Sequence, residues 1–299
     1  MIIRPKVNQF AILFTLKGSI AKRIALRALM VTLLASAIVL VEMLHPSNFT
    51  KVNATPFTLL GLSLSIFMSF RNNACYDRWY EARKAWGEII VHVRSVIRET
   101  HVIRESSERR AMLRNLCGFA HALNARLRRE NEAAASAEWI TPRHDAQVPD
   151  YSSRILQTIG QQCSQLHEAG ELNEWRYMLL ANHLTSLTQA QAVCDRIKNT
   201  PLPFPYTLLL HRTIYLFCIL LPFAMAEPLG WLTPLFTAIV SYTFFGLDAI
   251  ADELEDPFGR DENDLPTDSL VRSIERDILA ELGVEPLPPA LKPVDYILS

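Results

Sequence analysis

Glycine is scarce in this sequence, at ten of 299 residues. Runs in which apolar and polar residues alternate, the pattern of a half-buried β-strand, are also hard to find. Both features argue against a sheet and favour helices. The sequence lacks an excess of positive charge as well: its formal net charge is −1 at pH 7. That balance argues against the basic composition typical of a nucleic-acid-binding protein, so we expect no nucleic-acid partner.

Paired cysteines and catalytic motifs are missing too. The five cysteines are Cys75, Cys117, Cys163, Cys194 and Cys218. Their number is odd, and no two have the spacing of a CxxC pair or a zinc knuckle, so we expect buried, reduced thiols. No HExxH metal motif, glycine-rich phosphate loop or GxSxG elbow is present. The sequence therefore predicts neither an enzyme nor a bound cofactor.

What the sequence does have is long apolar runs. Hydrophobic residues make up 49% of the chain and charged residues 20%, a mixture that indicates a membrane part joined to a water-exposed part. Four apolar runs are apparent, at 24–44, 57–70, 207–226 and 229–247. The first is long enough to cross a hydrocarbon core of about 30 Å. Only Glu227 and Pro228 separate the last two runs, which predicts a tight helical hairpin.

The positive residues are distributed unevenly around these runs. Five Lys or Arg residues precede the first run, whereas the loop at 45–56 holds only Lys51. Four more follow the second run: Arg71, Arg78, Arg83 and Lys84. Because positive residues concentrate on the cytoplasmic side of membrane proteins, both termini and the 71–206 block are predicted to be cytoplasmic.

The block at 71–206 has apolar residues at the three- and four-residue spacing of amphipathic helices. In its first part Trp79, Ala82, Trp86, Ile89, Ile90, Val93 and Ile97 recur at three- and four-residue steps. We therefore predict an all-α integral membrane protein in which four transmembrane helices are continuous with a cytosolic helical bundle. The predicted division is 1–70 with the first two spans, 71–206 cytosolic, 207–247 with the last two spans, and 248–299 as an acidic cytosolic tail.

The second apolar run is short, at 14 residues, and meets polar sequence after Phe70 with no turn signal. A helix that continues to about Ile97 would be roughly 60 Å long at 1.5 Å per residue. Within the run, Leu62, Ile66 and Phe70 form a ladder of large apolar residues at four-residue spacing. The small residues Gly61, Ser65 and Ser69 form a second ladder beside it, and such residues allow close approach of membrane helices.

Two interpretations fit the two ladders. The first is ordinary packing between the spans of one subunit. The second is that copies of this helix surround the axis of a cyclic oligomer, where Leu62, Ile66 and Phe70 form apolar rings that gate by dewetting. The polar continuation favours the second, since the same face reaches Asn73 or Ala74 and then Asp77 and Glu81. These positions suit the mouth of a water-filled vestibule.

Three segments resemble the signature blocks of bacterial bestrophins. They are "PFTLLGLSLSIFMSFRNNACYDRWYEARKAWG" (56–87), "RIKNTPLPFPYTLLLHRTIYLF" (196–217) and "DELEDPFGRDENDLP" (252–266). The resemblance implies a homopentameric ion channel of a bacterial inner membrane with one axial pore. It also implies a narrow neck at the positions of Leu62, Ile66 and Phe70.

The same resemblance implies a second, cytosolic constriction on a helix before the third span. Helical register favours Leu180 for it, with Leu179 or Leu184 as alternatives.

In animal bestrophins an acidic run after "PFG" binds calcium, which makes Asp261, Glu262 and Asp264 weak calcium candidates here. This sequence departs from that pattern because Arg260 enters the run, and a solvated acidic collar is the preferred interpretation.

The predicted function is therefore a passive channel for monovalent ions. The carboxylates of Asp77, Glu81 and the acidic tail would attract cations, so a preference for cations over chloride is expected. The alternative is a membrane-anchored scaffold or sensor without conductance. The polar pair His211-Arg212 near the start of the third run is explained by the membrane interface, by a helix–helix contact or by a role in the ion path.

Overall fold

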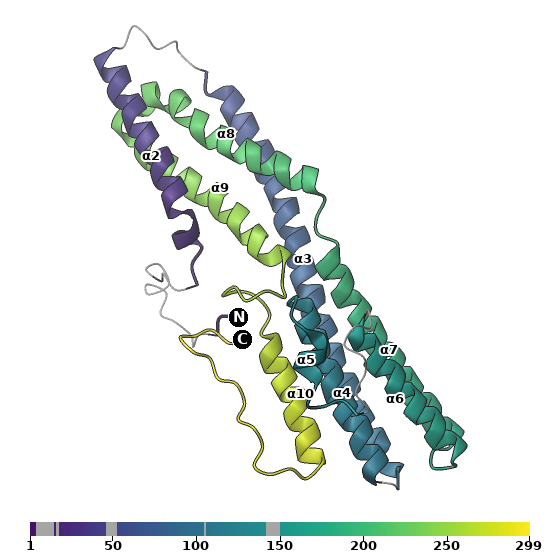
Figure 1. The fold of residues 1–299 in the computed structure, drawn as a ribbon. Helices are drawn as coiled ribbons and strands as arrows, with labels where there is room; N and C mark the ends of the chain where they lie inside the picture. The colour runs from purple at the N-terminus through teal and green to yellow at the C-terminus, as the bar shows by residue number, and fades with distance from the viewer. Residues whose placement is uncertain (4–14, 16–17, 46–52, 105, 142–149) are drawn as a thin grey trace. The chain divides into compact units, whose positions relative to one another are not determined.

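The computed structural model describes residues 1–3, 15, 18–45, 53–104, 106–141 and 150–299 (Figure 1). The described residues form no β-strand, only isolated bridges such as that between Ile2 and Ile297. The longer elements are α2 (Ala21–Leu44), α3 (Thr55–Glu99), α4 (Ser106–Leu127), α6 (Tyr151–Glu168), α7 (Glu174–Asn199), α8 (Phe204–Leu229), α9 (Thr233–Glu255) and α10 (Thr267–Glu281). The short ones are η2 (Thr100–Val102), α5 (Glu132–Ser136) and η3 (Gly230–Leu232). The all-α prediction is confirmed for these residues.

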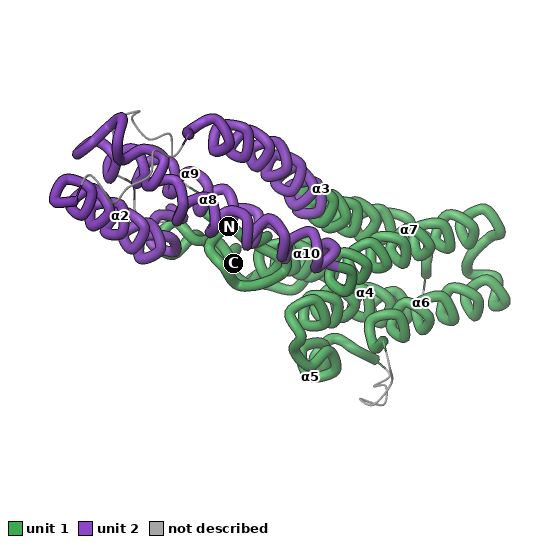
Figure 2. Tube along the Cα trace, turned by 90° about the horizontal axis from the view of Figure 1, so that it is seen from above, with its two compact units in different colours: residues 1–4, 80–200, 257–299 green, residues 5–79, 201–256 purple. Residues whose placement is uncertain are grey.

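The chain divides into two compact units, coloured separately in Figure 2. Unit 1 comprises Met1–Arg4, Tyr80–Thr200 and Pro257–Ser299, and unit 2 comprises Pro5–Trp79 and Pro201–Asp256. All four apolar runs fall in unit 2. Part of the charge argument, the basic residues Arg4, Lys6 and Lys17 and the loop residue Lys51, lies outside the described residues.

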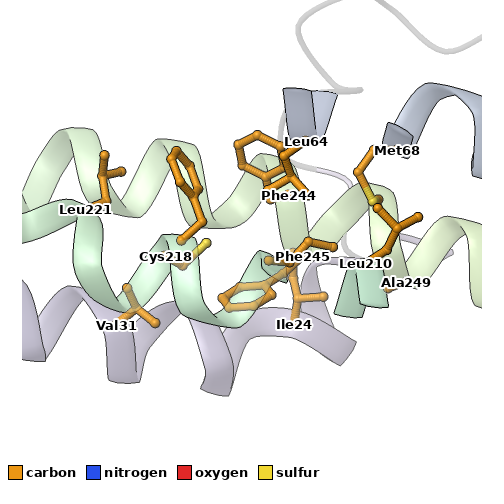
Figure 3. Packing of buried hydrophobic residues seen from close by; sticks show 12 residues of the cluster. Ile24, Val31, Leu64, Met68, Leu210, Cys218, Leu221, Phe244, Phe245 and Ala249 are labelled. Carbon is orange, nitrogen blue, oxygen red and sulfur yellow. The ribbon is translucent and has the colours of Figure 1, made fainter. Parts of the chain in front are cut away.

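Unit 2 has an apolar core between its helices. α2 packs against α8 and α9, and α8 packs against α9. Ile24 of α2, Cys218 of α8 and Phe245 of α9 are buried there, together with Leu64 and Met68 of α3 (Figure 3). By length and mean hydropathy, Ala21–Leu44 and the stretch Phe204–Glu255 are apolar enough to cross a membrane.

The predicted hairpin between the last two apolar runs is present, but its turn lies later than expected. α8 continues through Pro228 to Leu229, and the chain reverses at η3. Gly230 has φ of +50°, a left-handed conformation that glycine adopts without a Cβ clash. The hydroxyl of Thr233 donates to the carbonyl of Met225 at 2.9 Å, which connects the two helix ends.

α3 is one uninterrupted helix of 45 residues, about 68 Å long at 1.5 Å per residue. The expectation that the helix runs without a break from its apolar part to about Ile97 is thus confirmed (Figure 1). Within unit 1 its buried face carries Ala82, Trp86, Ile89 and Val93, residues taken from the periodicity of the sequence.

Unit 1 is built around α4, which packs against α5, α6 and α10. The middle of α4 carries a buried apolar stripe, with Leu116, Phe119 and Leu123 among its inaccessible side chains. α6 in turn packs against α7. The amphipathic pattern at 106–127 and 174–199 thus produces helices with a buried apolar stripe, as expected for a bundle.

Candidate pore-lining helix

The first half of α3 has two different faces. Leu64, Met68 and Arg71 are almost wholly buried, at 2%, 0% and 0% exposure. The ladder residues Leu62, Ile66 and Phe70 are exposed, at 61%, 48% and 60%. Ordinary packing inside one chain therefore does not account for the large apolar ladder, because other residues of the same helix form the contacts with the core.

The small-residue ladder has a mixed environment. A Cβ on Gly61 would lie 3.1 Å from the Cζ of Phe217, so the missing side chain lets α3 and α8 approach closely. The hydroxyl of Ser65 donates to the carbonyl of Gly61 at 2.8 Å, which satisfies that donor inside the helix. Ser69 is exposed. Close helix approach is thus seen at Gly61.

The three residues predicted for the pore mouth are all on the surface of the chain. Asn73 and Asp77 are exposed, and so is Glu81. The carboxylate of Glu81 accepts a hydrogen bond from the guanidinium of Arg196 on α7 at 2.5 Å. Its negative charge is therefore partly neutralised inside the chain, which weakens its attraction for a permeant cation.

A buried ionic cluster that the sequence motifs do not predict lies directly after the ladder. Arg71 donates from Nη1 to Asp248 at 2.7 Å and from Nη2 to Asp252 at 2.6 Å. The carboxylate of Glu255 lies 3.7 Å from the same Nη2. The side chains of Arg71 and Asp248 are both 0% exposed. The spacing of the three acids on α9, four and then three residues, places them on one helix face and was a signal available in the sequence.

His211 completes this cluster from α8. Its Nδ1 lies 2.9 Å from the second carboxylate oxygen of Asp248. Among the interpretations of the His211-Arg212 pair, the helix–helix contact therefore holds for the histidine. Nearby, the hydroxyl of Tyr206 donates to the carbonyl of Phe67 at 3.0 Å, a second polar contact between α8 and α3.

The acidic residues at 252–264 are occupied mainly by internal contacts. Glu253 pairs with Arg23 at 3.3 Å, and Asp252 and Glu255 surround Arg71. Asp264 is 4% exposed and accepts from the backbone N–H of Asp261 at 2.7 Å. A Cβ on Gly259 would lie 2.5 Å from Asp264 Oδ2, so glycine is required for this loop.

The calcium candidates do not form a common ligand set. Asp261 and Glu262 are exposed, whereas Asp264 is turned inward. In the part of the chain that the structure describes, no group of three or more His, Cys, Asp or Glu side chains could hold a metal ion. Among these acids Asp252, Asp256, Asp261 and Glu262 are exposed to solvent, whereas Asp264 is buried and departs from the predicted solvated collar.

The predicted cytosolic constriction residue needs a correction. Leu180 is 1% exposed and lies in the core of unit 1, where its side chain cannot reach an aqueous path. Leu184 is half-buried. On the same stretch of α7, Leu179 is exposed, at 44%, although it directly precedes the buried Leu180.

Comparisons with known proteins give one consistent result. The family model described as bacterial and fungal bestrophin protein matches residues 1–280. A voltage-dependent anion channel-forming protein of Mesorhizobium japonicum is 39% identical over 289 residues, covering 96% of this chain and 94% of the relative. The protein of that name from Escherichia coli K12 is 37% identical over 297 residues, covering 96% and 98%.

Solved structures agree with these relatives. The crystal structure of a bacterial bestrophin homologue from Klebsiella pneumoniae matches with a TM-score of 0.83 and 36% sequence identity, covering 88% of this chain and 100% of that chain. An enzymatic function is excluded by this set of matches, as predicted.

The expected preference for cations is wrong, because it conflicts with relatives named as anion channels. It rested partly on Glu81, which is paired with Arg196, and on the acidic tail, of which Asp252, Glu253 and Glu255 are paired with arginines.

Proposed function

The chain belongs to the bacterial and fungal bestrophin family, and we propose from this membership that it forms a membrane channel for monovalent anions. The channel is a homopentamer with a single pore on its axis. Five copies of α3 surround that axis, and their Leu62, Ile66 and Phe70 side chains form three stacked apolar rings. The observation that carries this proposal is the exposure of all three residues in the isolated chain.

The proposed neck acts as a hydrophobic constriction. Its rings bear no charge, so an ion passes by giving up part of its hydration shell, and a narrow apolar neck closes when water leaves it. Selectivity between anions and cations is set outside the neck. Within the chain, Glu81 is neutralised by Arg196, which reduces the negative field at the proposed mouth. Asn73 and Asp77 form the remaining part of that mouth.

The proposed topology has four membrane spans in the bacterial inner membrane, with both termini in the cytoplasm. Unit 2 provides the membrane layer, and unit 1 provides the cytoplasmic part. The cluster of positive residues after the apolar part of α3 supports this orientation. The exposed Leu179, in place of Leu180, is the residue of α7 best suited to a second constriction in the cytoplasmic part.

Reversal potentials test the proposal. The purified protein is reconstituted into a planar bilayer with a tenfold gradient of potassium chloride. The expected reversal potential lies close to the equilibrium potential of chloride. A value at the potassium equilibrium potential would contradict anion selectivity while leaving the channel intact. Absence of any current above that of protein-free bilayers would favour the alternative of a scaffold or sensor without conductance.

A further inference from the structure

The direction in which the ladder of α3 points depends on the rotation of this helix about its own axis. Adjacent residues of an α-helix are separated by about 100°. A rotation by one residue would therefore move Ile66 away from the face on which it now lies. The apolar contacts of Leu64 and Met68 restrict this rotation only weakly, because hydrophobic burial is non-directional.

Arg71 supplies a directional contact at this point. Its guanidinium donates through two different nitrogens to two different carboxylates, those of Asp248 and Asp252. Charge-assisted hydrogen bonds of this kind are shorter and stronger than neutral ones and have a defined geometry. Arg71 also follows Phe70 directly, so the contact lies one residue beyond the last ladder position.

The carboxylate side of the contact is itself fixed. Asp248 is fully buried and has both oxygens engaged, one by Arg71 and the other by His211. The three helices α3, α8 and α9 thus meet in one polar contact. Rotation of α3 by one residue would break both bonds and leave a buried carboxylate and a buried guanidinium without partners, which is strongly unfavourable.

We propose that Arg71 is a positioning residue that fixes the rotation of α3 through Asp248 and Asp252, and that it thereby directs Leu62, Ile66 and Phe70 toward the pore. The part concerning the pore rests on the proposed function; the fixed rotation itself does not. The ionic contacts of Arg71 set the rotation of α3, whereas the apolar contacts of Leu64 and Met68 hold the helix against the core of unit 2.

Thiol labelling tests the rotation without any measurement of current. The five native cysteines are buried, so their background reaction with a small anionic methanethiosulfonate reagent is low. Ile66→Cys places a thiol on the exposed face and Met68→Cys places one on the buried face. With Arg71 present, the thiol at position 66 should react and that at 68 should be protected. In Arg71→Met, the ratio of the two rates should fall about tenfold or more, the effect of losing a hydrogen bond between charged groups.

A matched control removes another arginine that binds α9. Arg23→Met breaks the ion pair with Glu253, which joins α2 and not α3 to α9, and the labelling ratio should stay unchanged. The reciprocal exchange R71D/D248R reverses the polarity of the contact and should restore the ratio relative to R71D alone. Arg71→Lys keeps the charge but loses the two-pronged geometry, so an intermediate ratio is expected.

The outcomes separate this inference from the proposed function. An unchanged ratio in Arg71→Met would overturn the positioning role. If Arg71→Met does not assemble, the exchange variant R71D/D248R provides the test. The positioning role would be overturned if this variant assembles and its ratio of labelling rates at positions 66 and 68 is no higher than that of R71D. If the thiol at position 66 does not react in the presence of Arg71, the result would argue against an aqueous neck. Even then, a thiol at position 68 that becomes reactive when Arg71 is changed would support the fixed rotation of α3.

Discussion

At the scale of single residues, two glycines inside helices of unit 1 have opposite surroundings. A Cβ on Gly118 of α4 would lie 2.3 Å from Ile140 Cδ1 and 3.2 Å from Trp139 Cβ. A Cβ on Gly160 of α6 would meet only Leu184 Cδ1, at 3.9 Å, an ordinary van der Waals contact. The same substitution therefore tests packing at one site and helix propensity at the other.

Gly118→Ala should lower the free energy of unfolding by about 1–3 kcal/mol, because the added methyl group forces the core of unit 1 to shift. Gly160→Ala should raise it by up to about 1 kcal/mol through the better helix propensity of alanine. Thermal unfolding of the two purified variants in detergent provides the measurement. Equal effects of the two substitutions would show that crowding at Gly118 is relieved without cost.

A second residue-scale feature is the contact between His92 on α3 and His183 on α7. Their Nδ1 atoms are 3.1 Å apart, so one ring must donate a proton and the other must accept it. Burial lowers the pKa of His183 below its ordinary value, and the neighbouring His92 lowers it further. Glu99 acts in the opposite direction on this pKa, and Arg98 adds to the lowering.

The stability of the protein should consequently fall as the pH drops below about 6.5, the ordinary pKa of histidine, since the unfolded chain then binds a proton that the folded His183 resists. Above that pH the group is neutral in both states and its contribution is constant. The difference in Tm between the wild type and His183→Gln should shrink from pH 7.5 to pH 5. A difference independent of pH would contradict the role of this histidine.

At the scale of the element, α3 is a single helix whose first half is apolar and whose second half, from Arg71, is polar. Its exposed ladder is too apolar for a water-exposed surface and lies on the opposite side from the residues that pack in the core of unit 2. The polar half begins at Arg71, where the ionic cluster with α9 is formed. The change of composition in the sequence therefore marks a change of surroundings along one continuous element.

Truncation of the ladder should widen the proposed neck. The triple variant with alanine at positions 62, 66 and 70 should show a severalfold larger single-channel conductance, since smaller rings are wetted more easily. Leu209→Ala is a suitable control because Leu209 is an exposed leucine of α8, at 64%, outside the ladder. Wild-type conductance in the triple variant would remove Leu62, Ile66 and Phe70 from the neck.

At the scale of the whole molecule, the proposed pore places five copies of the chain around the exposed ladder of α3. Native mass measurement in a mild detergent should give five times the 33.9 kDa of the single chain after subtraction of bound detergent. The family match supports this expectation, and the exposure of Leu62, Ile66 and Phe70 gives its physical reason. A single-chain mass under conditions that preserve ion flux would contradict the axial pore.

The sequence by itself determined the elements and the class of protein. The periodic apolar residues at 79–97 defined the buried face of α3, and the four apolar runs defined the helices of unit 2. The three signature blocks were sufficient to identify the family. These features are local, because helix periodicity and hydropathy are properties of neighbouring residues.

The tertiary structure decided which polar groups are available. The sequence predicts that Glu81 and the acidic tail attract cations, but Glu81 and the tail residue Asp252 are bound to arginines that lie far away in the chain. Leu180 was expected in a pore and lies in a core. A helical pattern gives the faces of one element, but which face is covered, and which charge is neutralised, depends on partners brought together only by folding.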